Sequence, residues 1–213
     1  MSDRWESLDL GGGSLELINL EHPEINQRVI AEIDVGVDVY YDRRWKATEA
    51  FGRLLYTLPE LVSGKSVLII GAGAGLETVV IGKLCDQLYI NDLAPVSLEI
   101  CQEQLDRNSI ACTGSLCGRY EELDLPDVDL IVGCFVVYEK ETRQAMETLL
   151  GKTDVLILLV NEELAAFQKL LKSTSREVER IGIDNVLAAM ECTEKQLVYG
   201  VGDIDNHNVY GGK

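Results

Sequence analysis

The stretch Ser66-Val-Leu-Ile-Ile-Gly-Ala-Gly-Ala-Gly-Leu76 decides the fold of this chain. Its apolar residues 67–70 predict a buried strand, because the run is too short to form a helix of its own. Three glycines follow at once, alternating with alanines, and apolar residues then recur at helical spacing over residues 76–83. The stretch therefore predicts a strand, a glycine turn and a helix.

A unit of this kind is typical of sites for nucleotide-like ligands. Glycine lets the backbone turn sharply and lets a ligand approach it, and a helix start offers free N–H groups. A dinucleotide site requires a third glycine three residues after the second, but here Gly75 comes two residues after Gly73, and Leu76 occupies the required position. The spacing G-x-G-x-G favours S-adenosylmethionine (SAM), which has no pyrophosphate. The alternative is a glycine turn that binds nothing.

Length and charge limit the classes of protein and partner. The chain has 213 residues, enough for one domain with a full core, and its net charge is −17. Such a surface repels phosphate backbones, so we expect no nucleic-acid partner. A basic protein or a neutral small molecule is easier to accommodate, and the acidity can also serve solubility alone.

The cysteines and histidines predict neither disulfides nor a metal site. None of the six cysteines forms C-x-x-C, and most fall in apolar stretches, as buried free thiols do. The histidines, His22 and His207, lie in polar stretches, so we expect no metal. Without a signal peptide or an apolar run of membrane-spanning length, the expected location is cytoplasmic, away from membranes.

The chain is expected to form one globular domain with a small N-terminal extension. Residues 1–14 are expected to be a loose tail, and residues 15–19 and 29–39 to form a hairpin, so that residues 1–44 are a tail and β extension. A helical stripe begins at Trp45 and ends at Pro59. Residues 45–213 would then form the main domain.

Strands and helices alternate through this domain. Further strands are expected at residues 87–90, 110–117, 129–133, 154–160, 178–183 and 196–201. Helices are expected at residues 95–108, 141–150 and 162–171. This order predicts an α/β fold with a Rossmann-like, doubly wound sheet of seven strands, mostly parallel. No clear helix separates the last two strands, so one of them should be antiparallel.

Four groups of residues fall at the carboxyl ends of the expected strands, where such sheets bind ligands. They are the glycine turn, Asp92, the segment after Cys117, and residues 134–138. Three features are also distinctive: Trp45 opening a helix before the first strand, the stretch Gly64-Lys-Ser-Val-Leu68 leading into the glycines, and Asn108 ending the helix after Asp92.

The segment Asp129-Leu-Ile-Val-Gly-Cys-Phe-Val-Val-Tyr138 completes the pattern, because it is similar to a D-L-I-x-G-x-D-x-x-Y element. Together these features resemble the class I, seven-β-strand SAM-dependent methyltransferases, and most of all the small protein-lysine methyltransferases. The resemblance covers about residues 45–150 and is weaker beyond them. It implies SAM as cofactor and a protein side chain of lysine type as methyl acceptor, with a small molecule as the other candidate.

The resemblance also implies roles in cofactor binding. Asp92, 21 residues after Gly71, would accept hydrogen bonds from the ribose hydroxyls; the alternative is a solvated turn aspartate. The backbone would pass close to the cofactor at Gly71, Ala72, Gly73 and Gly75.

Four further residues would surround the cofactor and the acceptor. Trp45 would cover the adenosyl group, and Tyr120 would lie beside the adenine. Cys134 would present its backbone, with an inert thiol. Tyr138 would position the acceptor as the catalytic-site residue, since a free tyrosine titrates near pH 10 and is a poor base. For Trp45, Tyr120 and Tyr138, plain packing is the alternative.

Two residues depart from the family pattern, which has an acidic residue at the position of Ile69 and an aspartate at that of Phe135. Three functions therefore stay open: an active methyltransferase, a methyltransferase-fold binding or scaffolding module, and a nucleotide-dependent oxidoreductase, which Leu76 disfavours. Phe135 also suggests that an apolar or aromatic acceptor, or a partner's side chain passing Phe135, replaces the usual lysine.

Overall fold

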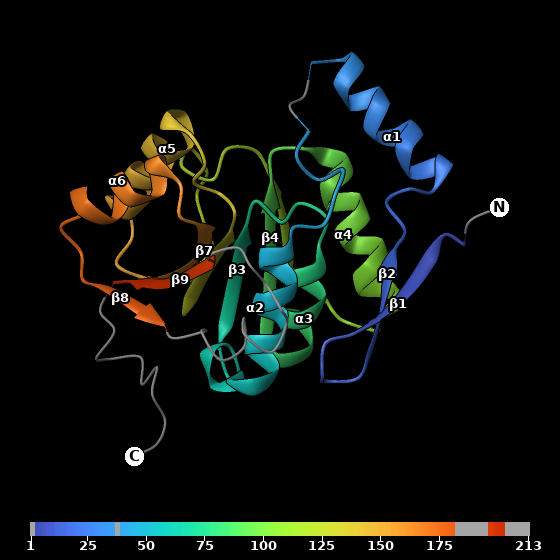
Figure 1. The fold of residues 1–213 in the computed structure, drawn as a ribbon, viewed down its shortest axis with the longest axis horizontal. Coiled ribbons are helices and arrows are strands. Elements are labelled where there is room, and N and C mark those ends of the chain that lie inside the picture. Colours follow the sequence, from blue (N-terminus) through green and yellow to red (C-terminus); the bar gives the residue numbers. More distant parts are fainter. Residues whose placement is uncertain (1–2, 37–38, 182–195, 203–213) are drawn as a thin grey trace.

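The computed structural model describes residues 3–36, 39–181 and 196–202. A seven-stranded sheet with the strand order β5-β4-β3-β6-β7-β9-β8 forms its centre (Figure 1). The strands are β3 (Ser66–Ile70), β4 (Gln87–Asp92), β5 (Gly114–Cys117), β6 (Leu130–Cys134), β7 (Leu156–Glu162), β8 (Val178–Ile181) and β9 (Gln196–Val201).

The strand directions confirm the expected topology. The five strands β3 to β7 run parallel, and β9 pairs antiparallel with both β7 and β8. The chain leaves β3 toward β4 on one side and later returns to β6 on the other, so the order of winding reverses at β3. Ligands of doubly wound sheets bind at such a reversal.

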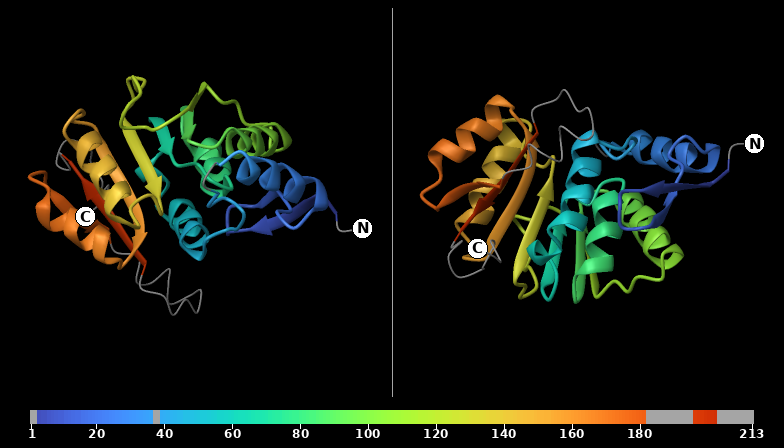
Figure 2. Two further views of the ribbon diagram at one scale, coloured as in Figure 1. Left: turned by 90° about the horizontal axis from the view of Figure 1, so that it is seen from above. Right: turned by 60° about the horizontal axis from the view of Figure 1, so that its bottom comes forward.

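Helices cover both faces of the sheet because side chains along a strand point alternately to either face. Val67 and Ile69 of β3 share a core with three helices, and Leu68 and Ile70 share a core with two others. The first group is α2 (Lys46–Thr57), α3 (Leu76–Leu84) and α4 (Pro95–Arg107), and the second is α5 (Lys140–Leu150) and α6 (Ala165–Ser173). Figure 2 shows the two groups on opposite sides of the sheet.

The central strands end level with one another, which determines where a ligand can bind. Ile70, the last residue of β3, is opposite Asn91 of β4 and Gly133 of β6. The loops that follow these three strands therefore meet at one edge of the sheet. They carry the glycine turn, Asp92 and residues 134–138.

The N-terminal region differs from its prediction. Residues 5–9, expected in a loose tail, form strand β1 (Trp5–Asp9), which pairs antiparallel with β2 (Ser14–Ile18). The strand expected at residues 29–39 is wrong as far as residue 34, since these residues belong to helix α1 (Pro23–Asp34). Pro23 suits a first helical turn, and Ile25 and Val29 bury one face at the four-residue spacing of a helix.

The N-terminal region packs beside α4 (Figure 1), where a second small core joins the two. Two polar side chains of α4 connect it to the hairpin. Gln104 Oε1 accepts the N–H of Ile18 at 2.9 Å, and Asn108 Nδ2 donates to the carbonyl of Glu16 at 2.7 Å. Asn108 thus ends α4 and also holds strand β2.

Other predicted boundaries are shifted slightly. Strand β5 begins only at Gly114, and the helix expected at residues 162–171 begins at Ala165, because Glu162 still belongs to β7. Residues 182 and 183 of an expected strand lie outside the described residues. In the described part of the chain, five cysteines are free, and no helix has the length and apolar character needed to span a membrane.

Candidate active site

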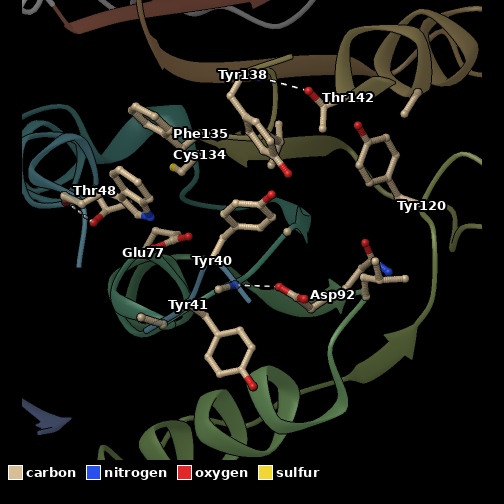
Figure 3. A pocket seen from close by; sticks show the side chains of 18 of the residues that line it. Tyr40, Tyr41, Thr48, Glu77, Asp92, Tyr120, Cys134, Phe135, Tyr138 and Thr142 are labelled. Atoms are coloured by element: carbon tan, nitrogen blue, oxygen red, sulfur yellow. Dashed lines mark hydrogen bonds between the residues drawn. The ribbon is translucent and has the colours of Figure 1, made fainter. Parts of the chain in front are cut away.

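A cavity of about 520 Å³ lies at the edge of the sheet where the three loops meet (Figure 3). Its volume falls within the range of about 300–1,000 Å³ that is usual for small-molecule and cofactor sites. Most of the residues singled out from the sequence line it: Trp45, Gly71, Gly73, Asp92, Tyr120, Cys134 and Tyr138. The fold thus gathers residues from distant parts of the chain around one cavity.

The glycine turn forms the floor of this cavity. Gly71 and Gly73 have φ values of +62° and +52°, in the left-handed region that other residues rarely adopt. A Cβ at Gly71 would stand 2.7 Å from Cγ1 of Val136, whereas one at Gly73 would have nothing nearer than 3.8 Å. The missing side chains therefore leave the backbone bare where it faces the cavity.

Ala72 and Gly75 are close in sequence but lie outside the cavity wall. The Ala72 side chain is fully buried in the core, and its N–H donates to the carbonyl of Asn91 at 2.9 Å. Gly75 is the N-cap of α3, and a Cβ there would approach Nε2 of Gln104 to 2.7 Å and Sγ of Cys101 to 2.8 Å. Both residues shape the turn from behind and do not face the cavity.

Asp92 ends β4 and is tied directly to the glycine turn. Its Oδ2 accepts the N–H of Gly73 at 2.8 Å (Figure 3), and its Oδ1 accepts the N–H of Ala94 at 2.9 Å. Burial raises the pKa of this carboxyl, and the hydrogen bonds from Ala94, Gly73 and Ser97 oppose the shift. Each carboxylate oxygen has a further lone pair, so Asp92 can still accept hydrogen bonds from a ligand.

Glu77, which the sequence analysis did not select, lies in the wall of the same cavity. It belongs to the first turn of α3, and only 4% of its surface is exposed. Burial raises the pKa of its carboxyl to about 8, and the negative charge of Asp92 adds to the shift. A carboxylate at the start of the mainly apolar run over residues 76–81 was the signal that could have identified it.

Two aromatic rings form one side of the cavity mouth. Trp45 precedes α2, and its ring stacks on Phe135 with centroids 4.7 Å apart and planes 9° apart. Phe135 follows β6 with a φ of +61°, an uncommon conformation for a residue with a side chain. The stacking and a 2.7 Å hydrogen bond from its N–H to the carbonyl of Val160 hold it there. Phe135, which stands where the family pattern has an aspartate, is therefore packed into the mouth together with Trp45.

Two tyrosines form a second part of the mouth. The rings of Tyr40 and Tyr138 have centroids 5.2 Å apart, and half of the Tyr40 surface is exposed. Tyr138 is held by its own loop, because its N–H donates to Oγ1 of Thr142 at 3.1 Å (Figure 3). The amide of Asn161 on β7 secures the same loop by donating to the carbonyl of Val137 at 2.9 Å. Tyr138 is thus fixed at the entrance.

Asn91 positions the segment that carries Tyr120. Its Nδ2 donates to the carbonyls of Leu116 and Gly118 at 3.0 and 2.9 Å, which holds the loop after β5 against β4. Tyr120 lines the cavity from this loop, and burial raises the pKa of its hydroxyl. Among the described residues its buried oxygen has no hydrogen-bond partner. Asn91 was not selected from the sequence, since a strand residue gives no local sign of this role.

The N-terminal region supplies another wall through Tyr41. The Tyr41 hydroxyl donates to the buried carboxylate of Glu32 on α1, and the same carboxylate accepts the N–H of Val96 at 2.8 Å. Burial, followed by the hydrogen bond to Glu32, raises the pKa of Tyr41. These hydrogen bonds therefore join three segments beside the cavity: helix α1, the segment before α2, and the start of α4.

Cys134 ends β6 and lines the cavity close to Phe135. Burial raises the pKa of its thiol well above the usual value, so the thiol stays protonated and unreactive at neutral pH. Among the described residues, no cluster of histidine, cysteine, aspartate or glutamate could hold a metal ion.

No protein-family model matches the chain. Human methyltransferase-like protein 22 is 24% identical over 198 residues, which are 91% of this chain and 46% of that protein. The chain therefore spans about half the length of this curated relative.

Solved structures show the same fold. The T. thermophilus 16S rRNA N2 G1207 methyltransferase, in complex with AdoMet and guanosine, matches with a TM-score of 0.60 and 16% identity over 94% of this chain and 50% of that one. The chain has the class I methyltransferase fold. A further match is the magnesium protoporphyrin IX methyltransferase of Synechocystis PCC 6803 with bound SAM, at a TM-score of 0.56 and 11% identity over 84% of this chain and 91% of that one. The expected fold class is confirmed.

Proposed function

We propose that this chain binds SAM at the glycine turn and transfers its methyl group to a protein side chain. The observation that carries the proposal is the direct hydrogen bond between Asp92 and the N–H of Gly73 at the edge of the sheet. It places a carboxylate beside bare backbone at the reversal of strand order, where doubly wound folds bind nucleotide-like ligands.

The residues around the cavity fit SAM in shape and in charge. The floor at Gly71 and Gly73 has no side chains, so an adenosyl group can lie against the backbone. Asp92 offers acceptor oxygens to a ribose diol. Trp45 and Phe135 offer apolar ring surface, and Glu77 offers a carboxylate to a positive charge. The methyltransferase relative and the SAM-bound structural neighbours support the same ligand.

The protein's part in methyl transfer is mainly binding, orientation and exclusion of water. Bound SAM supplies a methyl group activated by a positively charged sulfur. Asp92 and the glycine turn fix the cofactor end of the site, and the loop with Tyr138 fixes the acceptor end. The stacked pair of Trp45 and Phe135 excludes water from one side of the mouth. Holding the reacting atoms in line accounts for a large part of the rate enhancement in such reactions.

The mouth favours a cationic side chain as the incoming acceptor. The ring faces of Tyr40 and Tyr138 lie on one side, and Glu139 and Glu141 also line the cavity. Aromatic faces and carboxylates attract ammonium groups, and the net charge of −17 attracts a basic segment of protein. These features support the lysine-type acceptor that the sequence resemblance implies, with Tyr138 orienting it.

Calorimetric titration with SAM, with its demethylated product S-adenosylhomocysteine and with NAD tests the cofactor assignment. We expect both adenosyl ligands to bind and NAD not to bind. Binding of NAD alone would indicate an oxidoreductase, and binding of none would leave a scaffolding module.

Transfer of label from methyl-tritiated SAM into proteins of a cell extract tests the acceptor. We expect one labelled protein, with the label on a lysine. Phe135→Asp breaks the stacking on Trp45 and should reduce the labelling. Label on an apolar or aromatic acceptor would contradict the lysine assignment, and equal labelling by wild type and variant would contradict the role given to Phe135.

A further inference from the structure

The Glu77 carboxylate is buried in the cavity wall without a countercharge from the described residues. Its exposed fraction is 4%, and within the described part of the chain its carboxyl hydrogen-bonds to its own backbone alone. The arginines that line the cavity are engaged elsewhere: Arg43 with Asp42, Arg44 with Glu6, and Arg119 with Glu121. Buried carboxylates are normally paired, so Glu77, which has no countercharge among the described residues, is an exception that a bound cation would resolve.

The position of Glu77 relative to Asp92 indicates which part of a ligand it meets. Asp92 ends β4, and Cys134 ends β6. Besides burial, the charge of Glu77 raises the pKa of the Cys134 thiol, so the Glu77 and Cys134 side chains are close to each other. Strand β3 with the glycine turn lies between these two strands. A ligand whose ribose is at Asp92 and which crosses the turn therefore extends toward Cys134 and Glu77. In Figure 3 the Glu77 carboxylate points into the cavity near Cys134.

The chemistry of the far end of SAM matches this carboxylate. Beyond the ribose come the sulfur and then an amino acid, whose ammonium group is a compact cation with three donors. Ile69 of β3 lies on the face of the sheet that α3 covers. It is buried in the core and has no charge with which to bind an ammonium group. We propose that Glu77 is a cofactor-binding residue that receives the α-ammonium group of SAM and of S-adenosylhomocysteine. This inference rests on the proposed function.

Binding of an ammonium group to Glu77 should release a proton. The pKa of the free carboxyl is about 8, so at neutral pH it is mostly protonated, and a bound cation lowers that pKa. The titratable groups that interact with Glu77 are Asp92 on β4, Cys101 on α4 and Cys134 on β6. Burial keeps both thiols protonated, so they do not contribute near pH 7.

The test measures the affinity of the full chain for three ligands by calorimetry: SAM, S-adenosylhomocysteine and 5′-methylthioadenosine, which retains the ribose but lacks the ammonium group. Glu77→Gln should weaken binding of the first two by about 10- to 100-fold, as expected for a lost charge-assisted hydrogen bond. Binding of 5′-methylthioadenosine should change less than about twofold. Asp86→Asn, an exposed carboxylate before β4 at the opposite edge of the sheet, is the matched control and should leave all three affinities unchanged.

Proton release is the second readout, obtained by titrating S-adenosylhomocysteine in two buffers of different ionisation enthalpy near pH 7. Wild type should release protons on binding, and Glu77→Gln should release fewer. A loss of affinity for SAM alone would place Glu77 beside the sulfonium and overturn the inference. Equal losses of affinity for all three ligands would also overturn it. If wild type binds SAM and Glu77→Gln binds it equally well, the inference fails and the proposed function stands. If wild type binds no adenosyl ligand, both fail.

Discussion

The floor and the mouth of the cavity are built in different ways. The floor, taken together with the wall beside it, consists of the glycine turn, Asp92 and Glu77, which lie within one strand–helix–strand segment of the chain. The mouth consists of Tyr40, Trp45, Phe135 and Tyr138, which come from segments about ninety residues apart. Local sequence fixes the floor, whereas packing across the sheet fixes the mouth.

The difference separates two tasks. The floor has bare backbone and carboxylates, which suit a cofactor of constant structure. The mouth has ring faces and surface carboxylates, which suit a larger and more variable acceptor. Changes in the floor should therefore alter stability or cofactor affinity, and changes in the mouth should alter transfer with little effect on cofactor affinity.

The largest expected effect comes from Glu77→Gln on stability. The folded pKa of about 8 lies above the usual 4.5, so between these values the folded protein holds a proton that the unfolded chain has lost, and wild-type stability falls as pH rises. The variant has no carboxyl to titrate and so does not lose this stability. Its free energy of unfolding should exceed that of wild type by on the order of 4 kcal/mol near pH 8, and by much less near pH 5. Urea unfolding at both pH values measures the gap, and a gap independent of pH would show that Glu77 is not strained by burial.

A second effect should come from Gly75→Ala, directly behind the floor. The added methyl group meets Gln104 and Cys101 below 3 Å, and φ is +75°. We expect a loss of roughly 2–4 kcal/mol in the free energy of unfolding, from overpacking and backbone strain together. Gly64→Ala is the matched control, because its φ is +74° but nothing lies within 4 Å of the new Cβ. Urea unfolding should give a smaller loss for this control, and equal losses would contradict the packing argument.

Asp92→Ala should weaken SAM binding by about 100-fold, or about 2.7 kcal/mol. The change removes the acceptor that we propose for the ribose and also the acceptor that holds the N–H of Gly73. Calorimetry measures the loss, and circular dichroism checks that the variant remains folded. Unchanged affinity in a folded variant would remove Asp92 from the site.

The smallest effect is expected in the mouth. Tyr138→Phe removes a hydroxyl but keeps the ring that packs on Tyr40. Methyl transfer should fall by about tenfold, while the Kd for SAM should change less than about twofold, the pattern of a lost interaction with the acceptor. Kinetics with labelled SAM and calorimetry separate the two quantities. A matching change in the Kd for SAM would place Tyr138 beside the cofactor.

The sequence predicted the floor better than the rest of the molecule. A short apolar strand, alternating glycines and an aspartate at the end of the next strand are local patterns, and the structure brings Gly71, Gly73 and Asp92 together as expected. Ala72 and Gly75 lie behind the cavity lining because a turn has an inner and an outer side, and sequence spacing does not distinguish them.

The N-terminal region and the mouth were harder to predict for physical reasons. The apolar side chains of residues 29–34 are compatible with the repeat of a strand and with that of a helix. Only the packing of Ile25 and Val29 beside α4 selects the helix. The stacking of Phe135 on Trp45 is a long-range contact with no local sign. Glu77 is buried because α3 packs into the core on this face of the sheet, so its charge could be noticed in the sequence but the extent of its burial could not.

The most direct test of the central claim is a crystal structure of the chain with S-adenosylhomocysteine. We expect the ribose hydroxyls within hydrogen-bonding distance of Asp92, the adenosyl group against Gly71 and Gly73, and the amino-acid end toward Cys134. A ligand bound elsewhere, or one whose ribose lies away from Asp92, would contradict the claim.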